Sequence, residues 1–299
     1  MKTFFQWTAL YPPTDPSKVE ANLANLVGLS GGVLGLLMVL LGLDSGLAIY
    51  VPILASSVLF GLPHGAIDHL VILGLAKRRL SLKALSVVCL AYLGFVIAML
   101  ALWWAVPFLA VILFLGITVY HWGRADLAFE NLGADVVEQS IPKWLQLNHA
   151  LLRGVFPIGI PFLSFPQATE TVLNACSASF GYTYAVSEEL RLSILVGLLL
   201  LLLGEVAYLF FNKEARLKRF LEDAGLIAFF VWVPPLLAVG LYFCLWHGFR
   251  HVIRLIRYQS PSARDVSVGV GFKRFYLQAL PFTVASICIL AALQWALPE

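Results

Sequence analysis

Residues 194–211 read ILVGLLLLLLGEVAYLFF, and this stretch decides the fold class. A helix needs about 20 apolar residues to cross the hydrocarbon layer of a bilayer. Glu205 is the only acidic or basic residue in the stretch. Six other stretches follow the same pattern, so the sequence predicts an all-α integral membrane protein, a bundle of seven transmembrane helices. The predicted spans are 25–43, 47–75, 84–106, 107–130, 190–212, 225–253 and 275–297.

The composition agrees with a membrane protein and excludes another class of partner. Of the 299 residues, 60% are hydrophobic and only 12% are charged, about half the share usual in soluble proteins. The lipid bilayer is therefore the main solvent. The 20 basic residues give a net charge of +3, which is too dilute for the clustered phosphate contacts of nucleic-acid binding, so we expect no nucleic acid partner.

An eighth candidate helix lies at 144–165, but helix-breaking and polar residues interrupt it. Pro157 and Pro161 each remove a backbone donor, and His149 and Arg153 are costly to expose to lipid. We therefore expect an irregular segment here, either re-entrant or interfacial.

The amino-terminal segment, residues 1–24, differs from the rest of the chain. It contains Pro12, Pro13 and Pro16 and lacks a continuous apolar run followed by a small-residue cleavage site, so we expect no cleavable signal peptide. We expect this segment to be interfacial or cytoplasmic, and residues 25–297 to form a single polytopic domain.

Basic residues in short loops predict the orientation, because such loops stay on the cytoplasmic side. The loop at 77–83 is basic and the loop at 44–46 is not, which predicts a multi-pass protein of the cell membrane with a cytoplasmic amino terminus. Two later basic clusters, 213–219 and 254–274, cannot both be cytoplasmic, because the single predicted span 225–253 separates them. The second has fewer acidic neighbours, so we place it in the cytoplasm and the carboxyl terminus outside.

The most informative residues are the histidines. Ionisable groups inside a membrane helix are costly and usually face a bundle interior or a pathway. Five of the six histidines lie inside predicted spans, and the sixth, His149, lies in the interrupted segment. The five are His64, His69, His121, His247 and His251.

His247 and His251 form the strongest unit. Residues four apart on a helix lie about 40° apart around its axis, so both rings point at one place. This spacing can offer two nitrogens to one metal ion, but no glutamate lies between the two histidines, which excludes a zinc metalloprotease. The alternative is a pair of histidines that form hydrogen bonds between helices.

His64 and His121 each have an acidic residue nearby. Asp68 lies four residues after His64 and could orient its ring, whereas His69 lies about 140° around the helix and favours a structural role. Asp126 could orient His121 only if the helix bends near Gly123. Otherwise it caps the helix or pairs with Arg124.

If their three spans run parallel, as the orientation requires, His64, His121 and His247 all lie toward the cytoplasmic half. Together with His251 they suggest a site for Fe(II), Zn or Cu. His149 favours a structural or substrate-proximal role. Glu205 either partners a histidine or pairs with an arginine such as Arg153.

Three motifs resemble the Brp/Blh family of β-carotene 15,15′-dioxygenases: PHGAIDH at 63–69, YHWGRAD at 120–126 and HGFRH at 247–251. The resemblance implies that His64, His121, His247 and His251 bind Fe(II). It also implies that O₂ cleaves the central double bond of β-carotene to give two molecules of all-trans-retinal, with a functional link to a retinal-binding rhodopsin.

Aromatic residues near the motifs are candidates for a polyene tunnel. They are Phe60, Tyr120, Trp122, Phe129, Tyr242, Phe243, Trp246 and Phe249. Two other functions stay open: a different non-heme membrane oxygenase or desaturase acting on a lipid, and a histidine-lined transporter of metal ions or protons. A transport path would distribute polar residues through both halves of the membrane, whereas a catalytic centre would gather them at one depth.

Overall fold

The computed structural model describes residues 18–75, 80–130, 141–211, 216–259 and 267–296, and these contain helices and no strand. Seven helical segments are long and apolar enough to cross a membrane, which confirms the predicted all-α membrane bundle. They are Glu20–Leu40, Gly46–Gly74, Leu82–Ala105, Pro107–Glu130, Glu188–Phe211, Pro235–Arg257 and Val268–Ala292.

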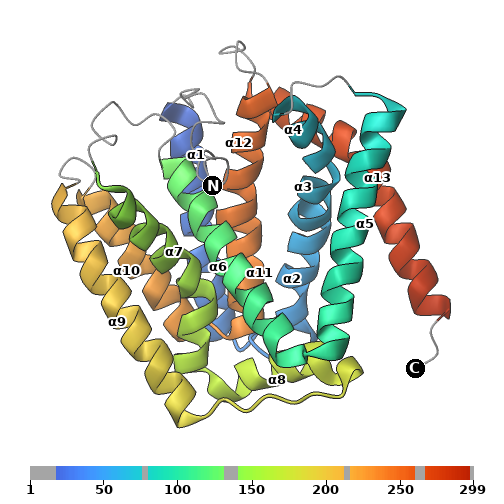
Figure 1. Cartoon of the computed structure of the whole chain (residues 1–299). Helices are drawn as coiled ribbons and strands as arrows, with labels where there is room; N and C mark the ends of the chain where they lie inside the picture. Colours follow the sequence, from blue (N-terminus) through green and yellow to red (C-terminus); the bar gives the residue numbers. More distant parts are fainter. Residues whose placement is uncertain (1–17, 76–79, 131–140, 212–215, 260–266, 297–299) are drawn as a thin grey trace.

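The helices run roughly side by side, and one short helix lies across an end of the bundle (Figure 1). That helix is α8, Pro166–Ser177. The others in the first half are α1 (Lys18–Leu40), α2 (Tyr50–Ser56), α3 (Leu62–Ala66), α4 (Asp68–Leu75), α5 (Leu82–Ala105) and α6 (Pro107–Glu130). Those in the second half are α7 (Lys143–Ser164), α9 (Glu188–Phe211), α10 (Arg216–Trp232), α11 (Pro235–Leu241), α12 (Phe249–Gln259) and α13 (Val268–Ala296).

The amino-terminal helix starts earlier than predicted. α1 begins at Lys18, so the last residues of the predicted segment 1–24 are helical. Residues 1–17 lie outside the described residues.

The expected irregular segment at 144–165 is instead the continuous helix α7, which contains Pro157 and Pro161. Leu152 and Phe156 on it are fully buried, because α6, α9 and α10 surround the helix. Polar residues and prolines are tolerated at this depth when protein rather than lipid covers them. The prediction of a re-entrant or interfacial segment here was wrong because it assumed lipid as the neighbour.

A pair of glycines brings α6 and α7 into backbone contact. A Cβ atom on Gly123 would overlap the carbonyl oxygen of Ala150, and one on Gly154 would overlap that of Val119. Gly123 therefore does not bend α6, which is continuous from Pro107 to Glu130.

The predicted span 225–253 is two antiparallel helices, α10 and α11, separated by a turn at Val233 and Pro234. Phe229 of α10 and Leu241 of α11 both lie against Gly35, and further along Glu222 lies 4.0 Å from Arg250. Hydropathy alone merged the two helices because the turn itself is apolar.

This reversal removes the conflict between the basic loops. Because α10 begins at the end of the bundle where α12 finishes, the described parts of the two clusters, 216–219 and 254–259, lie at the same end of the bundle (Figure 1). It also places His247 twelve residues after Pro235, close to the fourteen that separate His121 from Pro107.

Two π-helical segments interrupt the helices that carry the sequence motifs. One is η3, Ser57–Gly61, just before His64, and the other is η6, Tyr242–Gly248, which contains His247. Single π-helical turns are rare and occur frequently at functional sites. The η6 segment lies between two buried apolar clusters, one built on α7, α10 and α11 and the other on α3, α4, α12 and α13.

Candidate metal centre

Four histidines converge inside the bundle, and we call them the histidine cluster: His64 of α3, His121 of α6, His247 of η6 and His251 of α12. The ring centres of His64 and His251 lie 5.2 Å apart, and those of His121 and His247 lie 5.5 Å apart. His251 lies 6.0 Å from His121 and 5.9 Å from His247. The structure thus brings together all four histidines selected from the sequence.

The ring nitrogens of the histidine cluster suit metal coordination. Nδ1 of His64 donates to the Phe60 carbonyl oxygen at 3.0 Å. The other nitrogen, Nε2, then carries the free lone pair that a metal needs. Nδ1 of His251 is buried and has no hydrogen-bond partner among the described residues. An orphaned buried nitrogen beside three other rings fits a ligand whose partner is a metal ion.

Asp68 does not orient His64, contrary to the sequence-based expectation. The Asp68 carboxylate accepts a hydrogen bond from the Tyr92 hydroxyl at 2.8 Å, which ties α4 to α5. The backbone carbonyl of Phe60 takes the orienting role, because the π-helical turn before His64 places that oxygen beside the ring. His69 lies outside the cluster, where its Nδ1 contacts the Ala66 carbonyl oxygen at 2.9 Å and its ring packs on Phe282.

Gly248 allows the two π-helical segments to meet. A Cβ atom here would lie 2.9 Å from Cβ of Phe60 and 2.6 Å from the Phe243 carbonyl oxygen. A larger residue would therefore push η6 away from Phe60, whose carbonyl holds His64. Within this geometry the rings of His247 and His251 are nearly parallel, at an interplanar angle of 12°.

The histidine cluster can be reached from outside the bundle. His247 is buried, His64 and His251 are half-buried, and His121 is exposed although it lies well inside α6. The neighbouring side chains Ile117 and Tyr120 are exposed as well. In a membrane-spanning helix this exposed face lies toward lipid.

Three of the eight tunnel candidates contact the histidine rings. The ring centre of Trp122 lies 5.8 Å from that of His247, and the ring of Tyr242 packs on Trp122 and on His247. The ring centre of Phe243 lies 6.2 Å from that of His64. Phe60 contributes through its carbonyl.

The other four candidates pack on other side chains or are exposed, and their place in a tunnel stays a prediction. Tyr120 is exposed, and Phe249 packs on Phe272. Phe129 and Trp246 pack against the guanidinium group of Arg250 instead.

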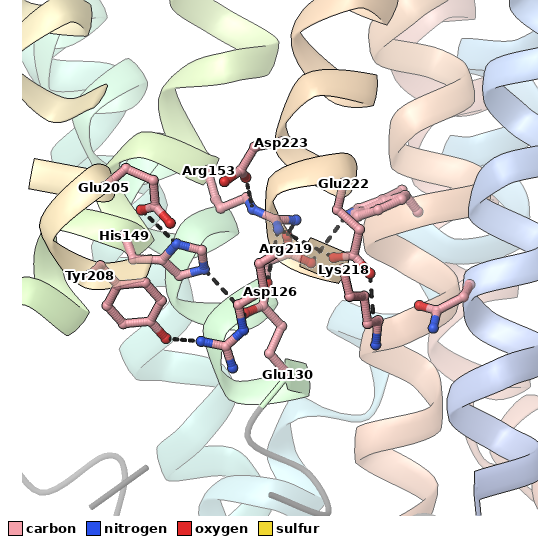
Figure 2. A network of polar contacts seen from close by, with 12 residues as sticks. Asp126, Glu130, His149, Arg153, Glu205, Tyr208, Lys218, Arg219, Glu222 and Asp223 are labelled. Atoms are coloured by element: carbon pink, nitrogen blue, oxygen red, sulfur yellow. Dashed lines mark hydrogen bonds and ion pairs between the residues drawn. The ribbon is translucent and has the colours of Figure 1, made fainter. Parts of the chain in front are cut away.

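Figure 2 shows a second polar region, which we call the buried charged cluster. Arg153 is at its centre, with contacts to Asp126 at 3.1 Å, Glu222 at 3.2 Å and Asp223 at 2.6 Å. The cluster comprises Asp126, Glu130, His149, Arg153, Glu205, Arg219, Glu222, Asp223 and Arg250.

The structure decides the open roles of two of these residues. Glu205 partners His149, at 2.8 Å from Nδ1, and not Arg153. Asp126 contacts neither His121 nor Arg124. Its carboxylate accepts hydrogen bonds from Trp246 and Arg250, on the helix that carries His247 and His251. The expectation that Asp126 orients His121 was wrong because α6 stays straight through Gly123.

Glu130, Glu222 and Asp223 were not selected from the sequence. Each lies near a helix end among other charged residues, where a solvated position is the ordinary expectation. The packing of α7 against both α6 and α10 brings them around Arg153. These carboxylates pair with basic residues on other helices. Such pairs follow no fixed spacing along the chain, so a single sequence does not reveal them.

Comparison with known proteins decides the family. The sequence profile of a family described as "Beta-carotene 15,15'-dioxygenase" matches residues 55–299. The chain belongs to this family. It is 34% identical over 264 residues to the "Probable beta-carotene 15,15'-dioxygenase Blh" of Halobacterium salinarum, covering 84% of this chain and 75% of that protein.

Two further relatives agree with the assignment. The chain is 24% identical to the "Beta-carotene 15,15'-dioxygenase" of an uncultured marine bacterium, 66A03, over 72% of this chain and 73% of that protein. It is 28% identical to the "Probable beta-carotene 15,15'-dioxygenase Brp" of Halobacterium salinarum, over 71% and 62%. No solved structure matches the chain. The chain is therefore an enzyme of the β-carotene 15,15′-dioxygenase family, which implies a metal cofactor.

Among the described residues, one group has ligand atoms within 4.8 Å of one another, as a bound metal ion requires: His149, Glu205 and Asp223. The histidine cluster, with ring centres 5.2 to 6.0 Å apart in the pairs given above, is the second candidate. However, both ring nitrogens of His149 contact carboxylates, Glu205 at 2.8 Å and Glu130 at 3.1 Å, so both must donate. A doubly protonated ring has no lone pair for a metal. Asp223 is already paired with Arg153, so the histidine cluster fits a metal better.

A large cavity of the dioxygenase lies away from both clusters. Its volume is about 680 Å³, and α6, α7 and α9 line it toward the end of the bundle crossed by α8. Among the described residues that line it, Asn148 and Tyr184 are polar and none is charged. None of the described residues that line it would bind a metal ion through a charged or imidazole group.

Proposed function

We propose that this protein cleaves the central double bond of β-carotene with O₂ to give two molecules of all-trans-retinal, using Fe(II) held by His64, His121, His247 and His251. The observation that carries this proposal is the convergence of four histidine rings with no carboxylate paired to any of them among the described residues. Imidazole ligands suit iron and leave its positive charge intact. The family assignment supports the substrate.

The iron would supply the site at which O₂ is activated next to the substrate. The protein supplies position and surroundings. The Phe60 carbonyl holds the ring of His64, and Gly248 lets the helix with His247 approach it. Trp122, Tyr242 and Phe243 surround the rings with apolar surface, which excludes water and can hold the polyene next to the metal.

Substrate entry from the bilayer fits the accessible side of the cluster. β-Carotene is apolar and about as long as the hydrocarbon layer is thick, so it partitions into lipid. The exposure of His121 and its neighbours on α6 supports a lateral entrance. Retinal would leave by the same route into the membrane, where a retinal-binding rhodopsin could take it up.

We place the amino terminus and the basic end of the bundle in the cytoplasm, with the protein in the cell membrane. Described basic residues gather at the end of the bundle opposite α8, while Arg191 lies at the α8 end (Figure 1). This asymmetry is what the retention of basic loops in the cytoplasm predicts. The gathered residues are Lys83, Lys143, Arg216, Lys218, Arg219, Arg254, Arg257, Lys273 and Arg274.

The distribution of polar groups favours catalysis over transport. A metal or proton path needs polar residues through both halves of the membrane. Here the histidine and charged clusters lie in the half toward the basic end, and the cavity in the other half is lined by uncharged residues. A non-heme oxygenase or desaturase acting on another lipid would share the metal site but not the family's named substrate.

The test is to express the full chain in cells that accumulate β-carotene and to measure retinal and remaining carotene by chromatography. Retinal formed by the wild type and absent with His247→Ala would support both the reaction and the site. Unchanged carotene in cells that contain folded protein and sufficient iron would overturn the proposed substrate.

A further inference from the structure

Asp126 connects the helix of one histidine to the helix of two others. Its Oδ1 atom accepts a hydrogen bond from Nε1 of Trp246 at 3.0 Å and from the Arg250 guanidinium group at 2.9 Å. Its Oδ2 atom accepts one from Arg153 at 3.1 Å. The side chain is buried, and Figure 2 shows it inside the charged cluster. Three donors from two other helices thus meet on one carboxylate.

The sequence register ties these contacts to the histidine cluster. Trp246 immediately precedes His247, and Arg250 immediately precedes His251. Adjacent residues on a helix point about 100° apart, so the same two turns present one pair to Asp126 and the other pair to the cluster. α6 supplies both Asp126 and His121, which makes two attachments between α6 and the segment η6–α12.

We propose that Asp126 is a positioning residue that fixes the rotation and height of η6–α12 relative to α6, so that His247 and His251 already face His121 before a metal binds. This inference rests on the proposed function, in which these histidines are the iron ligands. The contacts of Asp126 with Trp246 and Arg250 stabilise a segment that lacks the regular α-helical hydrogen bonds, because η6 is π-helical. The Arg250 guanidinium group lies 3.6 Å from the centre of the Trp246 ring, which stiffens the pair that Asp126 holds.

Charge alone does not explain the presence of Asp126. The buried charged cluster contains five carboxylates, Asp126, Glu130, Glu205, Glu222 and Asp223, against three arginines and the doubly donating ring of His149. Replacing Asp126 with asparagine would leave four negative and four positive groups. What the change removes is the acceptor geometry, because asparagine has one acceptor oxygen where aspartate has two.

The experiment measures metal retention by the purified full-length protein in detergent. Wild type, Asp126→Asn and Glu205→Gln are loaded with Fe(II) or with Co(II), and metal release to a chelator and the Co(II) absorption spectrum are recorded. Glu205→Gln is the matched control, since it removes a buried carboxylate of the same cluster that contacts His149 and not the helix of His247. Substitution of a residue that orients the ligands of a metal without binding the metal itself typically lowers metal affinity by about 10- to 100-fold.

We expect Asp126→Asn to release metal at least about tenfold faster than wild type and to shift the Co(II) spectrum, with Glu205→Gln close to wild type in both. Trp246→Phe, which removes one of the donors and keeps an aromatic ring, should lie in between and serves if Asp126→Asn does not fold. Wild-type metal release and spectrum in the variants that fold would overturn the positioning role, whatever their thermal stability. A wild type that binds no metal would instead refute the proposed iron centre.

Discussion

The histidine cluster and the buried charged cluster lie in one bundle, yet they differ in how their charges are paired. Every member of the charged cluster has a partner of opposite charge, and Arg153 alone contacts four carboxylates. Both clusters contain buried atoms without a hydrogen-bond partner among the described residues, such as Oε1 of Glu205 and Nδ1 of His251. In the charged cluster the residues that carry these atoms are ion-paired, whereas the four histidine rings face one another without a charged partner.

The difference separates function from stability. A cluster of paired opposite charges that joins α6, α7, α9 and α10 acts as a structural joint, and removing one member leaves the others unpaired in an apolar interior. A cluster of rings without charged partners and with a lipid-accessible side can bind a ligand that the protein itself does not supply. Apart from Asp126, which belongs to the charged cluster but holds the helix of His247 and His251, substitutions in the two regions should therefore have opposite signatures, one in activity and the other in stability.

The largest effect on activity is expected for His121→Ala. The ring is exposed, so its loss should change the thermal unfolding midpoint little, while retinal formation should fall to background because one of four metal ligands is gone. Retinal is measured by chromatography and the midpoint in detergent by circular dichroism. His69→Ala is the matched control, since it removes a histidine outside the cluster and should stay active. Retained activity in His121→Ala would remove this residue from the metal centre.

The largest effect on stability is expected for Arg153→Met. Methionine has a similar length but leaves four carboxylates without their shared cation, and breaking a buried ion pair in this way costs about 3–5 kcal/mol. The measurements are the amount of membrane-inserted protein and its thermal unfolding midpoint. A midpoint equal to that of the wild type would show that the charged cluster is not a structural joint.

A smaller effect that reaches both regions is expected for Gly123→Ala. The added methyl group overlaps the Ala150 carbonyl oxygen, so α6 and α7 must separate, which typically costs about 1–3 kcal/mol. His121 and Asp126 lie on either side of Gly123, so activity and stability should decrease together. Gly116→Ala on the same helix meets nothing within 4 Å and should be neutral or slightly stabilising. Equal unfolding midpoints for the two variants would contradict the close approach of α6 and α7.

The histidine cluster could be predicted from the sequence because its signal is local. Histidines are conspicuous in apolar spans, and the four-residue spacing of His247 and His251 is a property of one helix. The charged cluster could not be predicted, because its partners come from helices whose neighbours the sequence does not specify. The reversal of the chain at Val233 and Pro234 adds to this difficulty, since it places Glu222 beside Arg250.

In the fold too, the features that depend on a single helix could be predicted, and those that depend on neighbouring helices could not. Length and apolarity located six of the seven spans, because a membrane imposes both on each helix separately, but they merged Pro235–Arg257 with the end of α10. They could not identify α7 as a regular helix, because its prolines and charges are tolerated only when protein surrounds it. The contact between Gly123 and Gly154 likewise depends on which helices are neighbours, and glycine alone does not indicate that.

The smallest effect is expected for Asp68→Asn, and it distinguishes the sequence-based role of this residue from the structural one. If Asp68 oriented His64, its loss should lower activity and metal affinity about 10- to 100-fold. In the structure the Phe60 carbonyl orients His64 and Asp68 accepts from Tyr92, so the variant should lose only one partly exposed hydrogen bond, about 1 kcal/mol. Tyr92→Phe removes the same bond from the other side and should match Asp68→Asn in unfolding midpoint and in retinal formed. A tenfold or larger loss of retinal formation in Asp68→Asn but not in Tyr92→Phe would return Asp68 to the metal centre, because only a contact with the histidine could separate the two variants.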